Sequence, residues 1–84
     1  MHQTTARFWR CFARLPESVK KIARQNFQLL KTNPSHPSLH FKKVGRFWSI
    51  RVGIVHRALA MEDEGGFVWV WIGSHEEYER MIKE

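Results

Sequence analysis

The sequence predicts an α+β fold in which an N-terminal helical hairpin packs on a mainly antiparallel four-stranded sheet and a short helix ends the chain. Two segments with apolar residues at helical spacing come first, and segments that alternate between apolar and polar residues follow. Short turns join these alternating segments, so neighbouring strands are expected to run antiparallel. Because the helices and strands are segregated along the chain, the class is α+β. A length of 84 residues indicates a single domain over residues 1–84.

The first expected helix covers residues 4–14 and carries one apolar stripe. The stripe has the i, i+3, i+4, i+7 spacing and consists of Phe8, Cys11, Phe12 and Leu15. Thr4 or Thr5 can cap the N-terminus through a side-chain oxygen. Cys11 is the only cysteine, which excludes an internal disulfide and is typical of a reducing compartment. Its place on the stripe predicts a packed core thiol.

The second expected helix begins at Pro16 and Glu17 and runs to about Lys31. Proline is favoured in the first turn of a helix, and an acidic side chain there interacts favourably with the helix dipole. Its expected buried face consists of Val19, Ile22, Ala23, Phe27 and Leu30. Two prolines in the loop that follows, Pro34 and Pro37, are incompatible with a further helix.

The predicted strands cover the rest of the chain up to residue 72. The first spans residues 39–44, and a hairpin follows that turns at Gly53 and runs on to Met61. Residues 62–66 are rich in acids and glycine and form the next turn. Residues 67–72 are continuously apolar, which is typical of a central strand covered on both faces. Trp69 and Trp71 are expected on one side of it.

A capping pattern marks the start of the C-terminal helix. Ser74 is a natural N-cap, and Glu77 three residues later completes a capping box. This pattern places His75 in the first turn of the helix, next to the end of the central strand.

Positive charge is concentrated in the first two thirds of the chain. Residues 1–57 contain twelve Lys or Arg and one acid, whereas residues 58–84 contain two Lys or Arg and seven acids. A basic body of this kind attracts RNA, DNA or an acidic protein. The plain alternative is a solubilising surface without a ligand. No apolar run has the length that spans a membrane, and we expect a cytoplasmic protein without a membrane partner.

Two arginines stand in otherwise apolar strands, Arg51 before the Gly53 turn and Arg57 after it. A guanidinium beside a sheet core is costly unless it faces water or a bound anion. The pair therefore belongs either to the solvated face of the sheet or to a surface that binds phosphate. His56 alternates to the face opposite Arg57 and is expected to be structural.

The side chains that remain as candidates for binding or catalysis are mainly cationic. The chain lacks a glycine-rich phosphate loop and a Cys-x-x-Cys pair, and prolines keep His36 and His40 from the helical spacing of a zinc motif, so we expect no metal and no other cofactor. The cationic set consists of His40, Lys42, Lys43, Arg51, Arg57 and His75, with Tyr78 close by. It suits metal-independent cleavage of RNA, because histidine serves as acid or base near neutral pH and arginine stabilises charge on a phosphate.

In the order and spacing of several short motifs, the chain resembles the RelE/ParE superfamily of bacterial toxins from type II toxin–antitoxin systems. The motifs are Phe12-x-x-Leu15-Pro16, Arg51-Val52-Gly53 with His56-Arg57, and Trp71-Ile72-Gly73-x-His75-x-x-Tyr78. The stretch over residues 33–42 resembles a subgroup of the superfamily. The resemblance covers nearly the whole chain. It implies two helices against a curved antiparallel sheet, and tight binding by a cognate antitoxin protein.

In the ribonuclease branch of this superfamily the toxin cuts mRNA in the ribosomal A site, so the resemblance implies the ribosome and mRNA as partners. The catalytic residues that it implies are Arg57, His75, Arg51 and Tyr78, and the expected RNA-binding residues are His40, Lys42, Lys43 and Arg46. Arg57 matches the third-strand arginine that contacts the scissile phosphate. His75 falls where members place a histidine or arginine after the last strand.

Two other functions fit the same resemblance. The ParE branch binds and inhibits DNA gyrase without cleaving anything, and an arginine after the third-strand turn, like Arg57, occurs in both branches. A degenerate toxin would only bind its antitoxin. His40 and His75 favour the ribonuclease. The first edge strand of the superfamily has no counterpart in the sequence pattern, so the chain is expected to begin with a helix.

Overall fold

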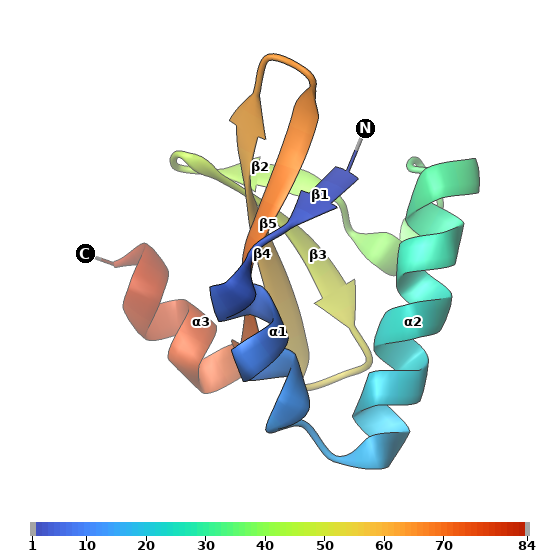
Figure 1. Cartoon of the computed structure of the whole chain (residues 1–84), viewed down its shortest axis with the longest axis vertical. Coiled ribbons are helices and arrows are strands. Elements are labelled where there is room, and N and C mark those ends of the chain that lie inside the picture. The colour runs from blue at the N-terminus through green and yellow to red at the C-terminus, as the bar shows by residue number, and fades with distance from the viewer. Residues whose placement is uncertain (1, 84) are drawn as a thin grey trace.

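The structure is a computed structural model that describes residues 2–83, and a five-stranded sheet forms its middle layer (Figure 1). The strand order is β1-β5-β4-β3-β2. The strands are β1 (His2–Thr4), β2 (Lys42–Val44), β3 (Phe47–Val52), β4 (His56–Asp63) and β5 (Gly66–Ser74). The helices are α1 (Ala6–Ala13), α2 (Glu17–Thr32), the single 3₁₀ turn η1 (Pro37–Leu39) and α3 (His75–Ile82). The predicted α+β class is confirmed.

The helical hairpin packs on one face of the sheet, as its apolar stripes predict. Thr5 caps α1, because its hydroxyl accepts a hydrogen bond from the backbone N–H of Phe8 at 3.1 Å. The main core lies between the hairpin and the sheet, and its fully buried members include Phe8, Ala23, Leu30, Ile50 and Trp69. Cys11 is half-buried and packs against this core, in agreement with a structural thiol.

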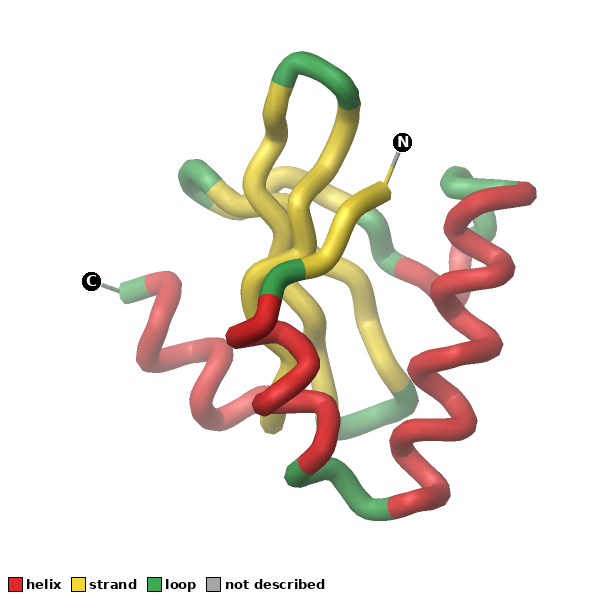
Figure 2. Tube along the Cα trace, in the orientation of Figure 1, coloured by secondary structure: helices red, strands yellow, loops and turns green. Residues whose placement is uncertain are grey.

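The opposite face of the sheet carries α3. Leu59 and Trp71 are buried on this face together with Tyr78 of α3. In Figure 1, α3 (red) and α2 lie on opposite sides of the strands, and Figure 2 shows the β4–β5 hairpin extending beyond the helices. The predicted capping box is confirmed, since the Ser74 hydroxyl accepts from the Glu77 N–H and the Glu77 carboxylate accepts from the Ser74 N–H.

The predicted number of four strands is one too few, and the chain does not begin with a helix. Residues His2–Thr4 form β1, which pairs in parallel with β5 at the edge of the sheet, and α1 begins only at Ala6. Three polar residues carry no detectable alternation. Backbone pairing with β5 holds β1 in place, so the side-chain pattern of residues 2–4 does not indicate a strand.

The segment before the sheet also differs from the prediction. Residues Pro37–Leu39 form a 3₁₀ turn, and the expected strand over residues 39–44 is reduced to Lys42–Val44. Proline is tolerated in the first position of such a turn, where no intrahelical N–H bond is lost. His36 supports the turn because its Nδ1 accepts from the Ser38 N–H at 3.2 Å.

Trp69 and Trp71 lie on opposite faces of β5, and the expectation of a shared side is wrong. The register shifts at this point: Ala60 pairs with Trp69, whereas the preceding Leu59 pairs with Trp71. Val70 is therefore an extra residue in β5, which is a β-bulge. The bulge sends Trp69 into the core under the helical hairpin and Trp71 into the cluster under α3.

Within residues 2–83, the helices are too short and too polar to cross a membrane.

Candidate functional site

The predicted arginine pair exists and lies on the face of the sheet that also carries α3. Arg51 of β3 and Arg57 of β4 are directly opposite each other in the antiparallel ladder, and both are half-buried. Leu59, two residues from Arg57, is buried under α3, so period-two alternation places both arginines on this face. Like charges at opposed ladder positions repel each other. This arrangement concentrates positive charge at one point of the sheet.

Arg57 is held in place by an aromatic ring and keeps hydrogen-bonding capacity. Its guanidinium carbon lies 5.8 Å from the centroid of the Tyr78 ring, a cation–π distance. Its Nη1 is buried and has no hydrogen-bond partner among residues 2–83. Buried donors without a partner are rare in folded proteins, and a ligand is one of the groups that satisfies them. Arg57 therefore has the properties of an anion-binding side chain.

His75 lies beside the same tyrosine. Its ring centroid is 5.6 Å from that of Tyr78, and its backbone N–H donates to the Val55 carbonyl at 2.7 Å. Its Nε2 lies 3.0 Å from Oε1 of Glu79, one helical turn later. The carboxylate only accepts, so Nε2 carries a proton in this contact and Nδ1 of the neutral ring is an acceptor. Nδ1 is buried and finds no partner in the described part of the chain.

Arg51 points toward the edge of the sheet, where His40 meets it. Its Nε donates to the Gly53 carbonyl at 3.1 Å, and its Nη1 lies 3.3 Å from Nε2 of His40. His40 has the left-handed backbone conformation, with φ of 48°, directly after the 3₁₀ turn. Arg51 is thus anchored more firmly than Arg57, and His40 contacts Arg51 alone of the two arginines.

The other three predicted RNA-binding residues are divided between locations. Lys42 pairs with Ser49, which shares the face of Arg51, whereas Lys43 pairs with Trp48 on the helical-hairpin face. Arg46 lies in the β2–β3 turn, with its guanidinium carbon 5.6 Å from the Phe47 ring centroid. The arginine pair, His75, Tyr78 and Lys42 thus lie on one face, His40 lies at the edge of the sheet, and Lys43 lies on the other face.

Sequence reasoning missed two residues at this site. Glu79 contacts His75, and their i, i+4 spacing on a helix is the signal that would have indicated the pair. Gly73 is opposite Arg57 on β5, and an added Cβ there would lie 2.9 Å from the Glu77 carboxylate and collide with the Trp71 ring. Because Gly73 has no side chain, the Trp71 ring and the capping box of α3 can pack beside Arg57.

The donor set of this site suits an anion rather than a cation. Within residues 2–83 there is no group of three or more His, Cys, Asp or Glu side chains arranged to hold a metal ion. Two guanidiniums with an acid–base histidine beside them stabilise a phosphate and transfer a proton. The arrangement is therefore chemically suited to a phosphate ester.

Comparisons with known proteins give a family and a fold. Residues 17–80 match the family described as the ParE-like toxin domain. Among solved structures, RelE in the RelB–RelE antitoxin–toxin complex of Methanococcus jannaschii is similar, with a TM-score of 0.74 and 13% identity over 94% of this chain and 96% of that one. A chain of the toxin–antitoxin complex RelBE2 of Mycobacterium tuberculosis is similar with a TM-score of 0.65 and 18% identity, over 88% and 95% of the two chains.

No protein among the curated sequences matches the chain. The family match covers most of the chain, and both structural likenesses extend over almost all of it. The predicted resemblance to the RelE/ParE superfamily is confirmed, and the chain belongs to the family of ParE-like toxin domains.

Proposed function

We propose that this protein is the toxin of a type II toxin–antitoxin system, and that it is a metal-independent, ribosome-dependent mRNA endoribonuclease of the cytoplasm that a cognate antitoxin neutralises. The solved structures that resemble it come from toxin–antitoxin complexes, which supports the antitoxin as a partner. The observation that carries the ribonuclease assignment is the opposed pair Arg51 and Arg57 beside His75, with buried polar atoms of Arg57 and His75 left without partners within residues 2–83.

The proposed reaction is transfer of a phosphodiester to the neighbouring 2′-hydroxyl. A base removes the 2′-hydroxyl proton, the oxygen attacks phosphorus, the bond from phosphorus to the 5′-oxygen breaks, and an acid protonates that oxygen. The products are a 2′,3′-cyclic phosphate and a free 5′-hydroxyl. Arg57 and Arg51 stabilise the charge of the phosphorane, because fixed guanidinium donors need little reorganisation as that charge develops.

His75 is the proposed proton-transfer group. Its ring contacts Glu79 through Nε2 and packs beside Tyr78, which also contacts Arg57. Tyr78 thereby contacts both the proposed acid–base residue, His75, and the proposed phosphate-binding residue, Arg57. In this proposal Lys42 and His40, which both lie on the β2 side of Arg51, contact the RNA backbone next to the scissile phosphate.

The test is cleavage of an mRNA on purified, programmed ribosomes, read by primer extension. We expect new 5′ ends within the A-site codon, which disappear with Arg57→Ala and His75→Ala. Arg80→Ala is the control, because Arg80 is an exposed cation on the same helix outside the site. Uncut mRNA from the unaltered protein would refute the ribonuclease. Inhibition of DNA gyrase in a parallel supercoiling assay would then assign the ParE type of function, and lack of both effects would leave a protein that only binds its antitoxin.

A further inference from the structure

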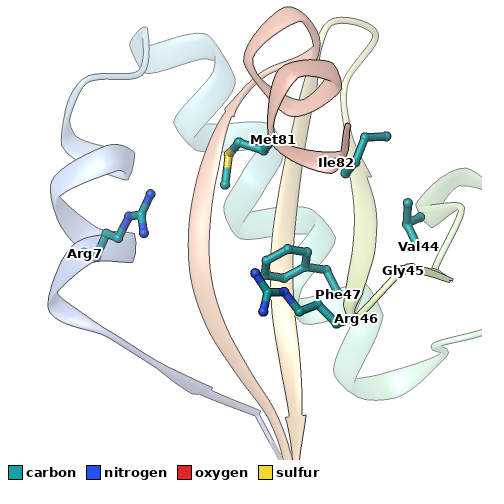
Figure 3. Close-up of a pocket in the computed structure, with 7 residues that line it drawn as sticks. All are labelled: Arg7, Val44, Gly45, Arg46, Phe47, Met81 and Ile82. Atoms are coloured by element: carbon teal, nitrogen blue, oxygen red, sulfur yellow. The ribbon is translucent and has the colours of Figure 1, made fainter. Parts of the chain in front are cut away.

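A basic hollow lies on the α3 side of the sheet, at the far end of α3 from the arginine pair (Figure 3). It is a cavity of about 300 Å³. Apart from a turn glycine, its lining consists of Arg7, Val44, Arg46, Phe47, Met81 and Ile82. Val44 is opposite Phe47 in the β2–β3 ladder, and Phe47 shares the face of Arg51 four residues along β3. The hollow and the arginine pair are thus separate parts of one face.

The charged part of this hollow is cationic. In Figure 3, Arg7 of α1 and Arg46 of the β2–β3 turn extend toward each other from opposite sides of the view, and the Arg46 guanidinium lies next to the Phe47 ring. Both side chains are exposed, and within residues 2–83 neither forms an ion pair with a carboxylate. The described lining contains no acidic residue. A ligand that reaches both guanidiniums is therefore expected to carry negative charge.

The rest of the lining is apolar and selects against a nucleobase. Val44, Met81 and Ile82 are half-buried aliphatic or thioether side chains. One face of the Phe47 ring is already taken by the Arg46 guanidinium, 5.6 Å from the ring centroid, so it is not a free stacking platform. Base edges are recognised by hydrogen bonds, and apart from the two guanidiniums no lining side chain among residues 2–83 carries a polar group.

We infer that this hollow binds a short segment of a partner protein in which acidic and aliphatic residues alternate. An aliphatic side chain enters the gap beside Met81 and Ile82, and carboxylates on either side of it pair with Arg7 and Arg46. A guanidinium can form two parallel hydrogen bonds with one carboxylate, so each arginine can hold one acidic side chain of the peptide. The volume is at the lower end for ligand pockets and fits one or two side chains rather than a helix. The binding of an acidic and aliphatic segment is inferred from the hollow itself. Only the assignment of that segment to the antitoxin rests on the proposed function.

The test uses an acidic peptide of defined sequence and the whole toxin labelled with ¹⁵N. The probe is acetyl-Glu-Leu-Glu-Glu-Leu-Glu-amide, and the matched peptide has Gln at each Glu. We expect the acidic peptide to shift the backbone signals of Phe47 and Met81, and the Gln peptide to leave them unchanged. Arg7→Glu and Arg46→Glu should each weaken binding about tenfold. Glutamate at the second position of α1 suits the helix dipole, so Arg7→Glu is expected to fold.

Arg10→Glu is the control for charge, because Arg10 is exposed on the same helix and does not line the hollow. At an ionic strength of 0.15 M the screening length is about 8 Å, so this change should alter peptide binding less than twofold. An equal loss with Arg10→Glu, or no loss with either pocket variant, would overturn the inference. So would an oligouridylate that shifts the same signals and is weakened by the same two variants, because the hollow would then be an RNA subsite. None of these measurements requires the toxin to cleave RNA, so a failed ribonuclease assay leaves them valid.

Discussion

Arg51 and Arg57 face each other directly across the β3–β4 ladder, on the face of the sheet that carries α3. Opposed like charges destabilise a sheet by a few tenths of a kcal/mol up to about 1 kcal/mol. Arg51 offsets this cost through contacts with Gly53 and His40, whereas Nη1 of Arg57 is left unpaired within residues 2–83. The unpaired donor of Arg57 resembles a binding group more than a structural one, because a bound anion would satisfy it.

The first prediction concerns the charge of Arg57. Arg57→Met keeps a long side chain against Tyr78 but removes the repulsion from Arg51. We expect the free energy of unfolding, measured by urea denaturation, to stay equal or to rise by about 0.5 kcal/mol. We expect mRNA cleavage to fall by about 10²- to 10³-fold, as for loss of one electrostatic donor.

Arg80→Met is the matched control and should change neither quantity appreciably, since Arg80 is exposed. If Arg57→Met lost several kcal/mol of stability and retained cleavage, Arg57 would be a structural residue.

The second prediction concerns the contact between His75 and Glu79. The carboxylate holds the imidazole with its proton on Nε2, so Glu79→Gln should disturb ring orientation and tautomer while leaving the fold intact. We expect cleavage at saturating ribosome concentration to fall about tenfold with little change in KM. The side-chain ¹⁵N signals of His75 report the tautomer independently of activity.

Glu76→Gln makes the same charge change in the first turn of α3 and is the control. If both variants behaved alike, the effect would come from the net charge of α3. An unaltered His75 tautomer in Glu79→Gln would show that the carboxylate does not position the ring.

Local patterns in the sequence predicted the elements that local interactions determine. The capping box at Ser74 and the hairpin turn at Gly53 involve residues close in sequence, and both are confirmed. Gly53 has φ of 67°, which glycine adopts without strain. The arginine pair was predictable for the same reason, because a tight hairpin and period-two alternation place both side chains on one face.

The features that the sequence pattern did not reveal depend on distant partners. β1 exists because His2–Thr4 pair with β5 some 65 residues later, and the Thr5 hydroxyl donates to the Trp69 carbonyl at 3.1 Å. The bulge at Val70 is visible only from the register of β4 against β5, because the run from Phe67 to Ile72 is apolar at every position. Without alternation, nothing in that run indicates where its faces change.

The third prediction follows from the lowered pKa of His2. Burial is the main cause, and nearby positive charge that includes Lys31 adds to it. The neutral ring accepts a hydrogen bond from Trp69 Nε1 at 3.1 Å and stacks on Phe67. Since its pKa is lower in the folded than in the unfolded chain, the unfolded chain binds the proton first as the pH falls.

The contribution of His2 to stability is therefore complete above the unfolded pKa of about 6.5, and is lost as the pH falls from there through the folded pKa. His2→Gln offers an acceptor that does not titrate, so its stability should fall less between pH 7 and pH 5 than that of the unaltered protein. Urea denaturation across this range measures the difference. Parallel curves for the two proteins would refute the role of His2.

The last prediction tests the space beside Arg57. Gly73 is buried opposite this arginine, and an added Cβ would meet the Trp71 ring and lie 2.9 Å from Oε1 of Glu77. Gly73→Ala should lower the free energy of unfolding by about 1–3 kcal/mol, because the indole is rigid and the carboxylate belongs to the capping box. Gly65→Ala is the matched control: a Cβ there meets nothing within 4 Å, and stability should be unchanged or slightly higher. Equal stability of the two variants would mean that Trp71 moves freely. Cleavage should fall in Gly73→Ala beyond its loss of stability, because displacement of Trp71 or of the α3 cap also moves Tyr78 and His75 relative to Arg57.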